Sequence, residues 1–193
     1  MSPIPHRHLT LTFLVTLLID QVSKWYIFEH VLRLNGDKMS FLDWLIHTQS
    51  IEATLASFTD YTVVKITSFF NLVTVWNTGV SFGFLQDSAN YMPTVLTIFA
   101  FIMSLILFIW ARRTTHKVES LSLVLIASGA FGNAFDRLRF KGVADFIDIH
   151  YNGWHWPAFN VADSAIFIGA VLLLIYSFRS TPKNDVEPTE KDT

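Results

Sequence analysis

Asp145 and Asp163 are the two residues whose type and placement best suit acid–base chemistry. Asp145 follows one apolar segment in the string GVADFID, and Asp163 begins another in the string FNVAD. If those segments are neighbouring antiparallel helices, both carboxyl groups arrive at the same end of the pair. Two carboxylates so close together share one proton, because they cannot both ionise easily. One then takes a proton from water while the other protonates a substrate carbonyl or leaving group, which is the chemistry of amide hydrolysis.

Simpler roles remain open for both aspartates on the residues alone. Asp163 can cap the helix that it begins, and Asp145 can accept hydrogen bonds within a loop. A metal site is a further alternative, since Asp148, His150 and His155 follow Asp145 closely. In an extended segment, however, Asp148 and His150 share one face while Asp145 takes the other, and the sequence has no HExxH motif. We therefore rank a metal site well below the aspartate pair.

The composition predicts an integral membrane protein. The 193 residues are 51% hydrophobic and only 16% charged, whereas soluble domains carry about 25% charged residues. The formal net charge of −2 gives no reason to expect nucleic acid as a partner. The chain has no cysteine, which excludes disulfides, thiol catalysis and metal sites built on thiolates.

Four segments are apolar enough to cross a bilayer, which takes about 20 residues. They are residues 9–28, 91–110, 121–135 and 159–178. The sequence therefore predicts an all-α membrane protein, with residues 1–178 as a single domain and 179–193 as a disordered cytoplasmic tail. The basic residues beside the spans favour cytoplasmic termini, although only weakly.

Residues 29–90 and 136–158 are expected to lie outside the bilayer. Their β-branched and aromatic residues predict short strands. We expect these strands at residues 62–66, 69–75, 80–85 and 143–151. The fold class is then four transmembrane helices with a small β-rich appendage.

Polar residues within the spans are expected to support the aspartate pair. Asp20 and Lys24 are four apart, so they face the same way and form an ion pair, with Lys24 extending outward to water. Gly129, Asn133 and Asp136 recur along one face of the third span. We expect Asp136 to act as a supporting residue beside the pair.

Three further residues extend this support. Arg137 is expected to pair with Asp136 where the third span ends. Asn77 and Gly79 read as a turn. In that turn, Asn77 either caps its own backbone or holds the backbone of a substrate.

A small transporter or channel subunit is the main alternative class, with Asp20, Lys24 and Asp136 lining an ion path. Against it, the polar residues gather near one face of the membrane instead of marking a path across it. A non-enzymatic scaffold is a third class, and it would leave Asp145 and Asp163 without a role.

Four motifs in the chain resemble those of the lipoprotein signal peptidases, also called signal peptidase II. They are DQVSK at residues 20–24, FFNLVTVWNTGVSF at 69–82, GNAFDRLRFKGVADFID at 132–148 and WPAFNVADSAIFIG at 156–169. The last two are highly specific in combination, and the likeness covers about residues 9–178.

The resemblance implies four transmembrane helices with cytoplasmic termini, an extracytoplasmic β-rich cradle and a mobile surface helix or loop. The family cleaves prolipoproteins before a cysteine that carries a diacylglyceryl group, and it needs no metal. By this likeness Asp145 and Asp163 match the catalytic pair. Other motif positions that support or line the site are matched by Asp20, Lys24, Asn77, Gly79, Gly129, Asn133, Asp136, Arg137 and Asn160.

The same resemblance implies the partners and the location. We expect diacylglyceryl-modified prolipoproteins and membrane lipid as partners, no nucleic acid, and a monomer. The expected location is the bacterial inner membrane, with the active site on the extracytoplasmic face. Three features depart from the usual pattern: Ser128 replaces a common glycine, Trp76 replaces a polar residue, and residues 29–64 are longer than is typical.

Overall fold

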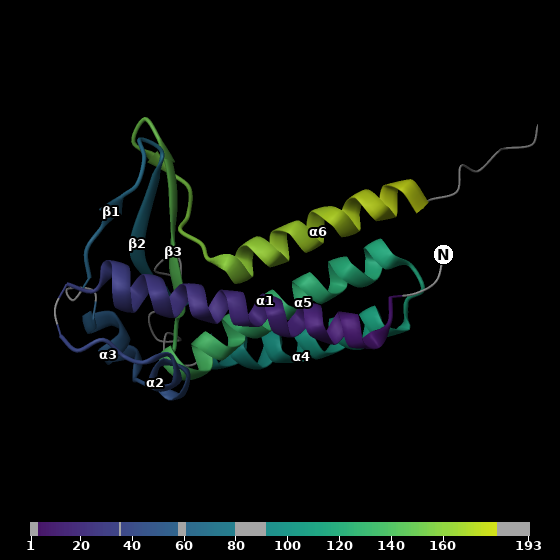
Figure 1. Cartoon of the computed structure of the whole chain (residues 1–193), viewed down its shortest axis with the longest axis horizontal. Coiled ribbons are helices and arrows are strands. Elements are labelled where there is room, and N and C mark those ends of the chain that lie inside the picture. The colour runs from purple at the N-terminus through teal and green to yellow at the C-terminus, as the bar shows by residue number, and fades with distance from the viewer. Residues whose placement is uncertain (1–3, 35, 58–60, 80–91, 181–193) are drawn as a thin grey trace, which may run out of the picture.

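The computed structural model describes residues 4–34, 36–57, 61–79 and 92–180. Four long helices run side by side along one axis (Figure 1). They are α1 (His6–Tyr26), α4 (Met92–Arg113), α5 (Lys117–Phe140) and α6 (Val161–Ser180). The α5 helix is central, because it contacts α1, α4 and α6.

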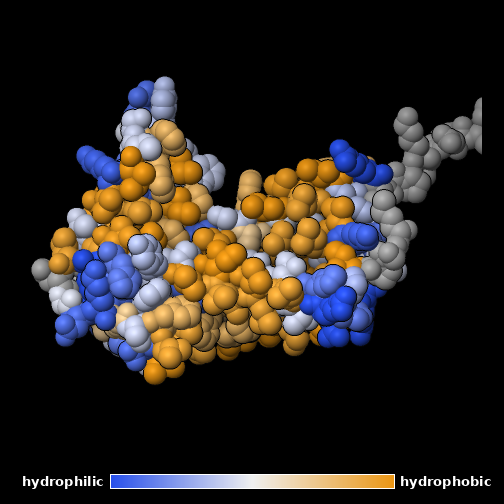
Figure 2. All heavy atoms as spheres, in the orientation of Figure 1, coloured by the Kyte–Doolittle hydropathy of each residue, from blue (hydrophilic) through white to orange (hydrophobic). Residues whose placement is uncertain are grey.

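The bundle has the length and surface of a membrane-spanning unit. Four helical stretches are long and apolar enough to cross a bilayer: His6–Leu32, Thr94–Arg113, Lys117–Phe140 and Val161–Arg179. Figure 2 shows a broad hydrophobic band over the bundle, with hydrophilic residues gathered at its two ends. Large apolar side chains exposed on this band, such as Phe99 and Phe167, face where lipid would lie. The expected four-helix membrane fold is confirmed.

A small antiparallel sheet crosses one end of the bundle (Figure 1). Its strands are β1 (Val64–Lys65), β2 (Phe70–Asn77), β3 (Val143–Tyr151) and β4 (Trp154–His155), paired in that order. The register between β2 and β3 places Val75 opposite Asp145 and Asn77 opposite Val143. The strand expected at 143–151 is confirmed with its bounds, and the strand expected at 80–85 lies outside the described residues.

The third span is longer than the sequence indicated. We expected it to end at residue 135, but α5 continues to Phe140, where Lys141 adopts a left-handed conformation with φ 58°. Asp136 and Arg137 therefore lie inside the helix and not in the loop that follows it. Residues 136–139 (DRLR) gave no sign of this extension, because charged side chains are not expected in a membrane span. In the structure these charged side chains face protein partners instead of lipid.

The region after α1 contains short helices that no periodicity in the sequence indicated, although the family resemblance implied a surface helix or loop. A π-helical turn, η1 (Ile27–Leu32), continues α1, and α2 (Phe41–Ile46) and α3 (Ile51–Ala56) follow it. Each short helix begins at a serine whose side chain accepts a hydrogen bond from the third residue of the helix. In the sequence, Ser40 and Ser50 were the residues that could have indicated where these two helices begin.

An aromatic core joins this region to the rest of the molecule. It consists of Phe28 from η1, Trp44 from α2, Trp76 from β2 and Phe140 from the end of α5, all buried. The ring centroids lie 5.1 Å apart for Phe28 and Trp76, and 4.9 Å apart for Trp44 and Phe140. Trp76, which departs from the family pattern, is thus accounted for by packing.

Glycine allows α5 and α6 to approach closely beside the site. A Cβ atom on Gly129 would lie 2.3 Å from the carbonyl oxygen of Ala162 in the first turn of α6. A Cβ atom on Gly132 would lie 2.7 Å from a carboxylate oxygen of Asp20 on α1. Both positions hold three helices together at the end of the bundle that carries the sheet.

Candidate active site

Asp145 lies on β3 with only 1% of its surface exposed. The side-chain amide of Asn160 donates a hydrogen bond to its Oδ1 atom at 2.6 Å. The pKa of Asp145 is raised to about 7, chiefly by burial and next by the nearby charge of Asp163. Hydrogen bonds from Asn77 and Asn160 act in the opposite direction. The pKa of Asp145 therefore lies close to neutral pH.

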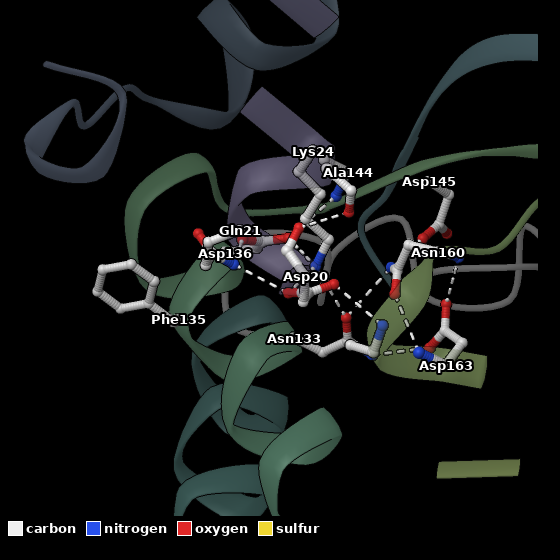
Figure 3. Close-up of polar contacts among 12 residues, drawn as sticks. Asp20, Gln21, Lys24, Asn133, Phe135, Asp136, Ala144, Asp145, Asn160 and Asp163 are labelled. Atoms are coloured by element: carbon white, nitrogen blue, oxygen red, sulfur yellow. Dashed lines mark hydrogen bonds and ion pairs between the residues drawn. The ribbon is translucent and has the colours of Figure 1, made fainter. Parts of the chain in front are cut away.

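Asp163 stands in the first turn of α6, and Asn160 immediately precedes that helix (Figure 3). The backbone N–H of Asp163 donates to Asn160 Oδ1 at 3.0 Å, and the backbone N–H of Asn160 donates to Asp163 Oδ2 at 3.1 Å. This is a reciprocal capping box. Asp163 thus has the capping role that the sequence left open. Its Oδ2 atom takes part in the cap, while its Oδ1 atom faces Asn133.

Two asparagines connect the aspartates (Figure 3). Asn133 on α5 donates from Nδ2 to Asp163 Oδ1 at 2.7 Å. Asn160, which is fully buried, donates from Nδ2 both to Asp145 Oδ1 and to Asn133 Oδ1, the latter at 3.2 Å. Amide groups therefore supply the donors that position these two carboxyl groups.

A buried ion network lies behind the asparagines. Lys24 pairs with Asp20 at 2.8 Å and with Asp136 at 2.7 Å, and it also donates to Asn133 Oδ1 at 3.4 Å. Arg139 pairs with Asp136 at 3.2 Å. Two acids and two bases thus neutralise one another where water is excluded, which buried charges require.

Two expectations about this network were wrong. Lys24 does not extend outward to water, because its side chain is fully buried between Asp20 and Asp136. The ion-pair partner of Asp136 on α5 is Arg139 and not Arg137. The spacing i, i+3 between Asp136 and Arg139 was the available signal, because residues three apart face each other on a helix and adjacent residues such as Arg137 do not.

Asp20 also acts on the helix that carries Asp163. Its Oδ1 atom accepts a hydrogen bond at 3.0 Å from the backbone N–H of Ala162, within the first turn of α6. A carboxylate is favoured there by the helix dipole. The first span therefore fixes where α6 begins.

Arg137 follows Asp136 on α5 and is partly buried. Its charge interacts with Asp145, Asp163 and Asp136 through space. The structure thus places Arg137 within electrostatic reach of the aspartate pair, although its expected contact with Asp136 is replaced by that of Arg139.

Asn77 and Gly79 end β2 beside the site. The backbone N–H of Gly79 donates to Asn77 Oδ1 at 3.0 Å, so Asn77 caps its own turn. Its side chain also forms a hydrogen bond with Asp145. Gly79 has φ 77°, and a Cβ atom there would lie 2.3 Å from Leu96 on α4. The left-handed backbone conformation favours glycine at this position, and any side chain there would also displace the end of Leu96.

The residues considered for a metal site do not gather around Asp145. Asp148 instead accepts hydrogen bonds from Asn71 at 2.8 Å and contacts His155 at 2.7 Å, while the ring of His150 stacks on that of His155. In the part of the chain that the structure describes, no group of three histidine, aspartate or glutamate residues could hold a metal ion.

An open apolar groove leads away from Asp163. It has a volume of about 600 Å³ and lies between the β3–β4 hairpin and the first two turns of α6. Asp163 is part of its wall, beside Ser164. The remaining lining residues are Ile149, Trp154, Trp156, Phe159, Phe167 and Ile168.

Asp145 is buried and Asp163 half-buried, and asparagines link the two carboxyl groups at one end of a bundle of membrane-spanning helices. This arrangement suits a membrane-embedded hydrolase of the aspartic type. Residues 12–179 match the family described as signal peptidase (SPase) II. The chain belongs to the signal peptidase II family of aspartic peptidases.

Individual relatives agree with this family, and two solved structures share the fold. A lipoprotein signal peptidase of Aeromonas hydrophila is 43% identical over 130 residues, which are 66% of this chain and 78% of that protein. One of Burkholderia multivorans is 48% identical over 115 residues, 59% of this chain and 69% of the relative. Two bacterial membrane enzymes of known structure share the fold. The first has TM-score 0.65 and 24% identity, covering 90% of this chain and 94% of its own. The second has TM-score 0.60 and 23% identity, covering 96% and 94%.

Proposed function

We propose that this protein removes the signal peptide from diacylglyceryl-modified bacterial prolipoproteins by cutting the peptide bond before the lipidated cysteine. The relatives named above are lipoprotein signal peptidases, which supports this substrate. The observation that carries the chemistry is the asparagine-linked pair of Asp145 and Asp163, with the pKa of Asp145 raised to about 7.

The proposed mechanism uses one proton on two carboxyl groups. The ionised aspartate removes a proton from a water molecule, and the oxygen of that water attacks the peptide carbonyl carbon. The protonated aspartate gives its proton to the carbonyl oxygen as the tetrahedral intermediate forms. Collapse of that intermediate breaks the C–N bond, the released amine takes the proton that came from water, and the former carbonyl oxygen returns its proton to the aspartate that supplied it. No metal and no other cofactor enters this scheme.

Asn77 and Arg137 are proposed to contact the substrate. Asn77 is exposed at the end of β2, next to Asp145. An extended peptide laid along that edge would meet its side-chain amide. The positive charge of Arg137 near the pair favours the negative charge that develops on the carbonyl oxygen.

We also propose that the site faces the extracytoplasmic side of the membrane. Hydrophilic residues cover the opposite end of the bundle, where α1 begins, α4 is joined to α5 and α6 ends (Figure 2). The basic residues there are Arg7, Arg112, Arg113, Lys117 and Arg179. By the positive-inside rule they favour a cytoplasmic location for that end, but only weakly, because Arg33, Lys38, Arg137, Arg139 and Lys141 lie towards the sheet end.

A direct assay tests the function. Purified protein is incubated with a prolipoprotein that carries the diacylglyceryl group and, separately, with the same precursor lacking it. We expect release of the signal peptide from the modified precursor only. Equal release from both precursors would contradict the proposed substrate, and release from neither would contradict the proposed activity.

The groove beside Asp163 is proposed to receive acyl chains of the lipidated residue. It is apolar, it opens on the face of α6 that meets lipid, and one of the two reacting carboxyl groups forms part of its wall. Phe167 is 69% exposed in this groove, so it can contact a ligand without supporting the protein core.

Replacing Phe167 with alanine should raise KM about tenfold while leaving kcat nearly unchanged. The lost contact is made equally in the ground state and the transition state, and burying such a side chain contributes about 1.5–3 kcal/mol. The matched control is Phe178→Ala, on the same helix, 81% exposed and near its other end. An unchanged KM in Phe167→Ala, or an equal rise in the control, would remove the groove from the proposal.

Cleavage should slow as pH rises through about 7. The pKa of Asp145 is raised to about 7, chiefly by burial and next by the charge of Asp163, and loss of its proton removes the general acid. Above that pH we expect kcat to fall about tenfold per pH unit. A profile that stays flat from about pH 6 to about pH 9 would argue against a shared proton.

The same shift links pH to stability. The folded state binds this proton more tightly than the unfolded chain does, since the pKa of Asp145 lies above its ordinary value of 3.8. The stabilising contribution of proton binding is therefore full below 3.8 and lost as pH rises through about 7. An Asp145→Asn variant should gain melting temperature over the parent at pH 8, and the gain should shrink towards pH 5.

A further inference from the structure

We propose that Arg139 is a positioning residue that ties the α2–α3 segment (residues 36–57) to the ion network behind the aspartate pair. This inference rests on the proposed function, because its effect is read in the rate of cleavage. The sequence motifs do not single out Arg139, and the α2–α3 segment belongs to the stretch that is longer than usual.

The guanidinium group of Arg139 joins three elements. Its Nη1 atom donates to the backbone carbonyl oxygen of Trp44 on α2. Its Nη2 atom donates to Gln21 Oε1 on α1 at 2.7 Å and pairs with Asp136 Oδ1 on α5 at 3.2 Å. The side chain is only 3% exposed. A buried cation held by a backbone oxygen, an amide oxygen and a carboxylate fixes the relative position of all three elements.

Two aromatic faces hold the group in that orientation. The central carbon of the guanidinium lies 4.2 Å from the ring centroid of Phe135 and 4.4 Å from that of Phe140. Planar stacking and forked donation are properties of arginine that lysine lacks. A lysine here would keep the charge but could not reach Trp44, Gln21 and Asp136 together.

The α2–α3 segment is bound to the end of α5 at two other points. The backbone N–H of Gln49 donates to the carbonyl oxygen of Arg139 at 2.9 Å. The hydroxyl of Thr54 donates to the carbonyl oxygen of Phe140 at 2.5 Å. The last carbonyl groups of a helix have no partners within it, so the segment serves as the cap of α5.

Contacts continue from Arg139 to the reacting groups. Asp136 pairs with Lys24, Lys24 donates to Asn133, and Asn133 donates to Asp163 at 2.7 Å (Figure 3). A shift of the segment that moves Asp136 therefore changes the hydrogen bonds of Asn133, and with them the orientation of Asp163.

A second route reaches the other side of the site. Ser57, which follows α3, accepts a hydrogen bond at 3.2 Å from the indole N–H of Trp76. The ring of Trp76 also packs on Phe140, with centroids 5.2 Å apart. Trp76 immediately precedes Asn77 on β2, so the segment supports both the network and the strand end beside Asp145.

Two conservative substitutions test the inference. Arg139→Lys keeps the charge and removes the forked geometry, and Thr54→Val removes one tie to α5 without touching any charge. We expect kcat to fall about tenfold in Arg139→Lys and about threefold in Thr54→Val, with KM within about twofold of the parent, since a misplaced catalytic group lowers the rate more than binding. The control is Arg113→Met, an exposed cation at the other end of the bundle.

The outcomes separate the inference from the proposed function. Parental kcat in both variants, with only a lower melting temperature, would make Arg139 purely structural and overturn the inference. A loss of kcat in Arg139→Lys alone would show that the α2–α3 segment takes no part, which also overturns it. The parent must cleave the lipidated precursor in the same assay and Asp145→Asn must not; failure there refutes the proposed function instead.

Discussion

Asp145→Asn and Asp163→Asn will each abolish cleavage of a lipidated precursor while the protein stays folded and inserted. Each substitution removes a general acid or a general base, and such groups contribute about 10²–10⁴-fold to a rate. Asparagine keeps the shape of the side chain and can still accept the hydrogen bond from Asn160 or Asn133. The measurement is single-turnover release of the signal peptide, with melting temperature as the check on folding.

Asp148 provides the matched control for this prediction. It lies on the same strand as Asp145, but its hydrogen bonds go to Asn71 and His155. Asp148→Asn should therefore cleave at nearly the parental rate. If either of the first two variants retained more than about a tenth of parental activity, the assignment of that carboxyl group would be wrong.

Lys24→Met will destabilise the protein by about 3–5 kcal/mol and stop cleavage. Lys24 is fully buried and contacts two carboxylates, and removing one partner of a buried pair costs about that much because a charge stays unpaired. Asp20 would keep its hydrogen bond to the first turn of α6 only if its charge stayed buried without Lys24 as its partner. Thermal unfolding in detergent, followed by tryptophan fluorescence, measures the change.

Two further variants define the cause. Lys65→Met removes an exposed lysine from β1 and should leave stability unchanged. Lys24→Met combined with Asp136→Asn removes one charge of each sign, so it should recover part of the loss. A melting temperature for Lys24→Met equal to that of the parent would mean that the network is not the support that its geometry indicates.

Spacing along helices predicted much of this site. Asp20 and Lys24 were expected to face one another, and Gly129, Asn133 and Asp136 to share one face, and the structure brings all five to the same end of the bundle. The apolar runs predicted the four spans, since lipid imposes both the length and the composition of a membrane-spanning helix.

Contacts between distant segments could not be predicted in that way. Nothing near Arg139 in the sequence indicates that its partners are Gln21 and the carbonyl oxygen of Trp44. The short helices α2 and α3 are too brief for periodicity to identify. Their contacts come from distant segments: Trp44 of α2 packs on Phe140, and Ser57, which follows α3, accepts a hydrogen bond from Trp76. Lys24 was expected to reach water because its partner Asp136, far along the chain, was unknown.

The ion network also bears on how the protein enters the membrane. Asp20 and Lys24 lie on one helix at spacing i, i+4, and Asp136 and Arg139 lie on another at spacing i, i+3. Each helix therefore brings one acid with one base of its own, and can cross the insertion machinery with these charges paired internally. Only after α1 and α5 meet does Lys24 add Asp136 as a second partner. Formation of the active site therefore does not require α1 or α5 to enter the lipid by itself with an unpaired charge of this network.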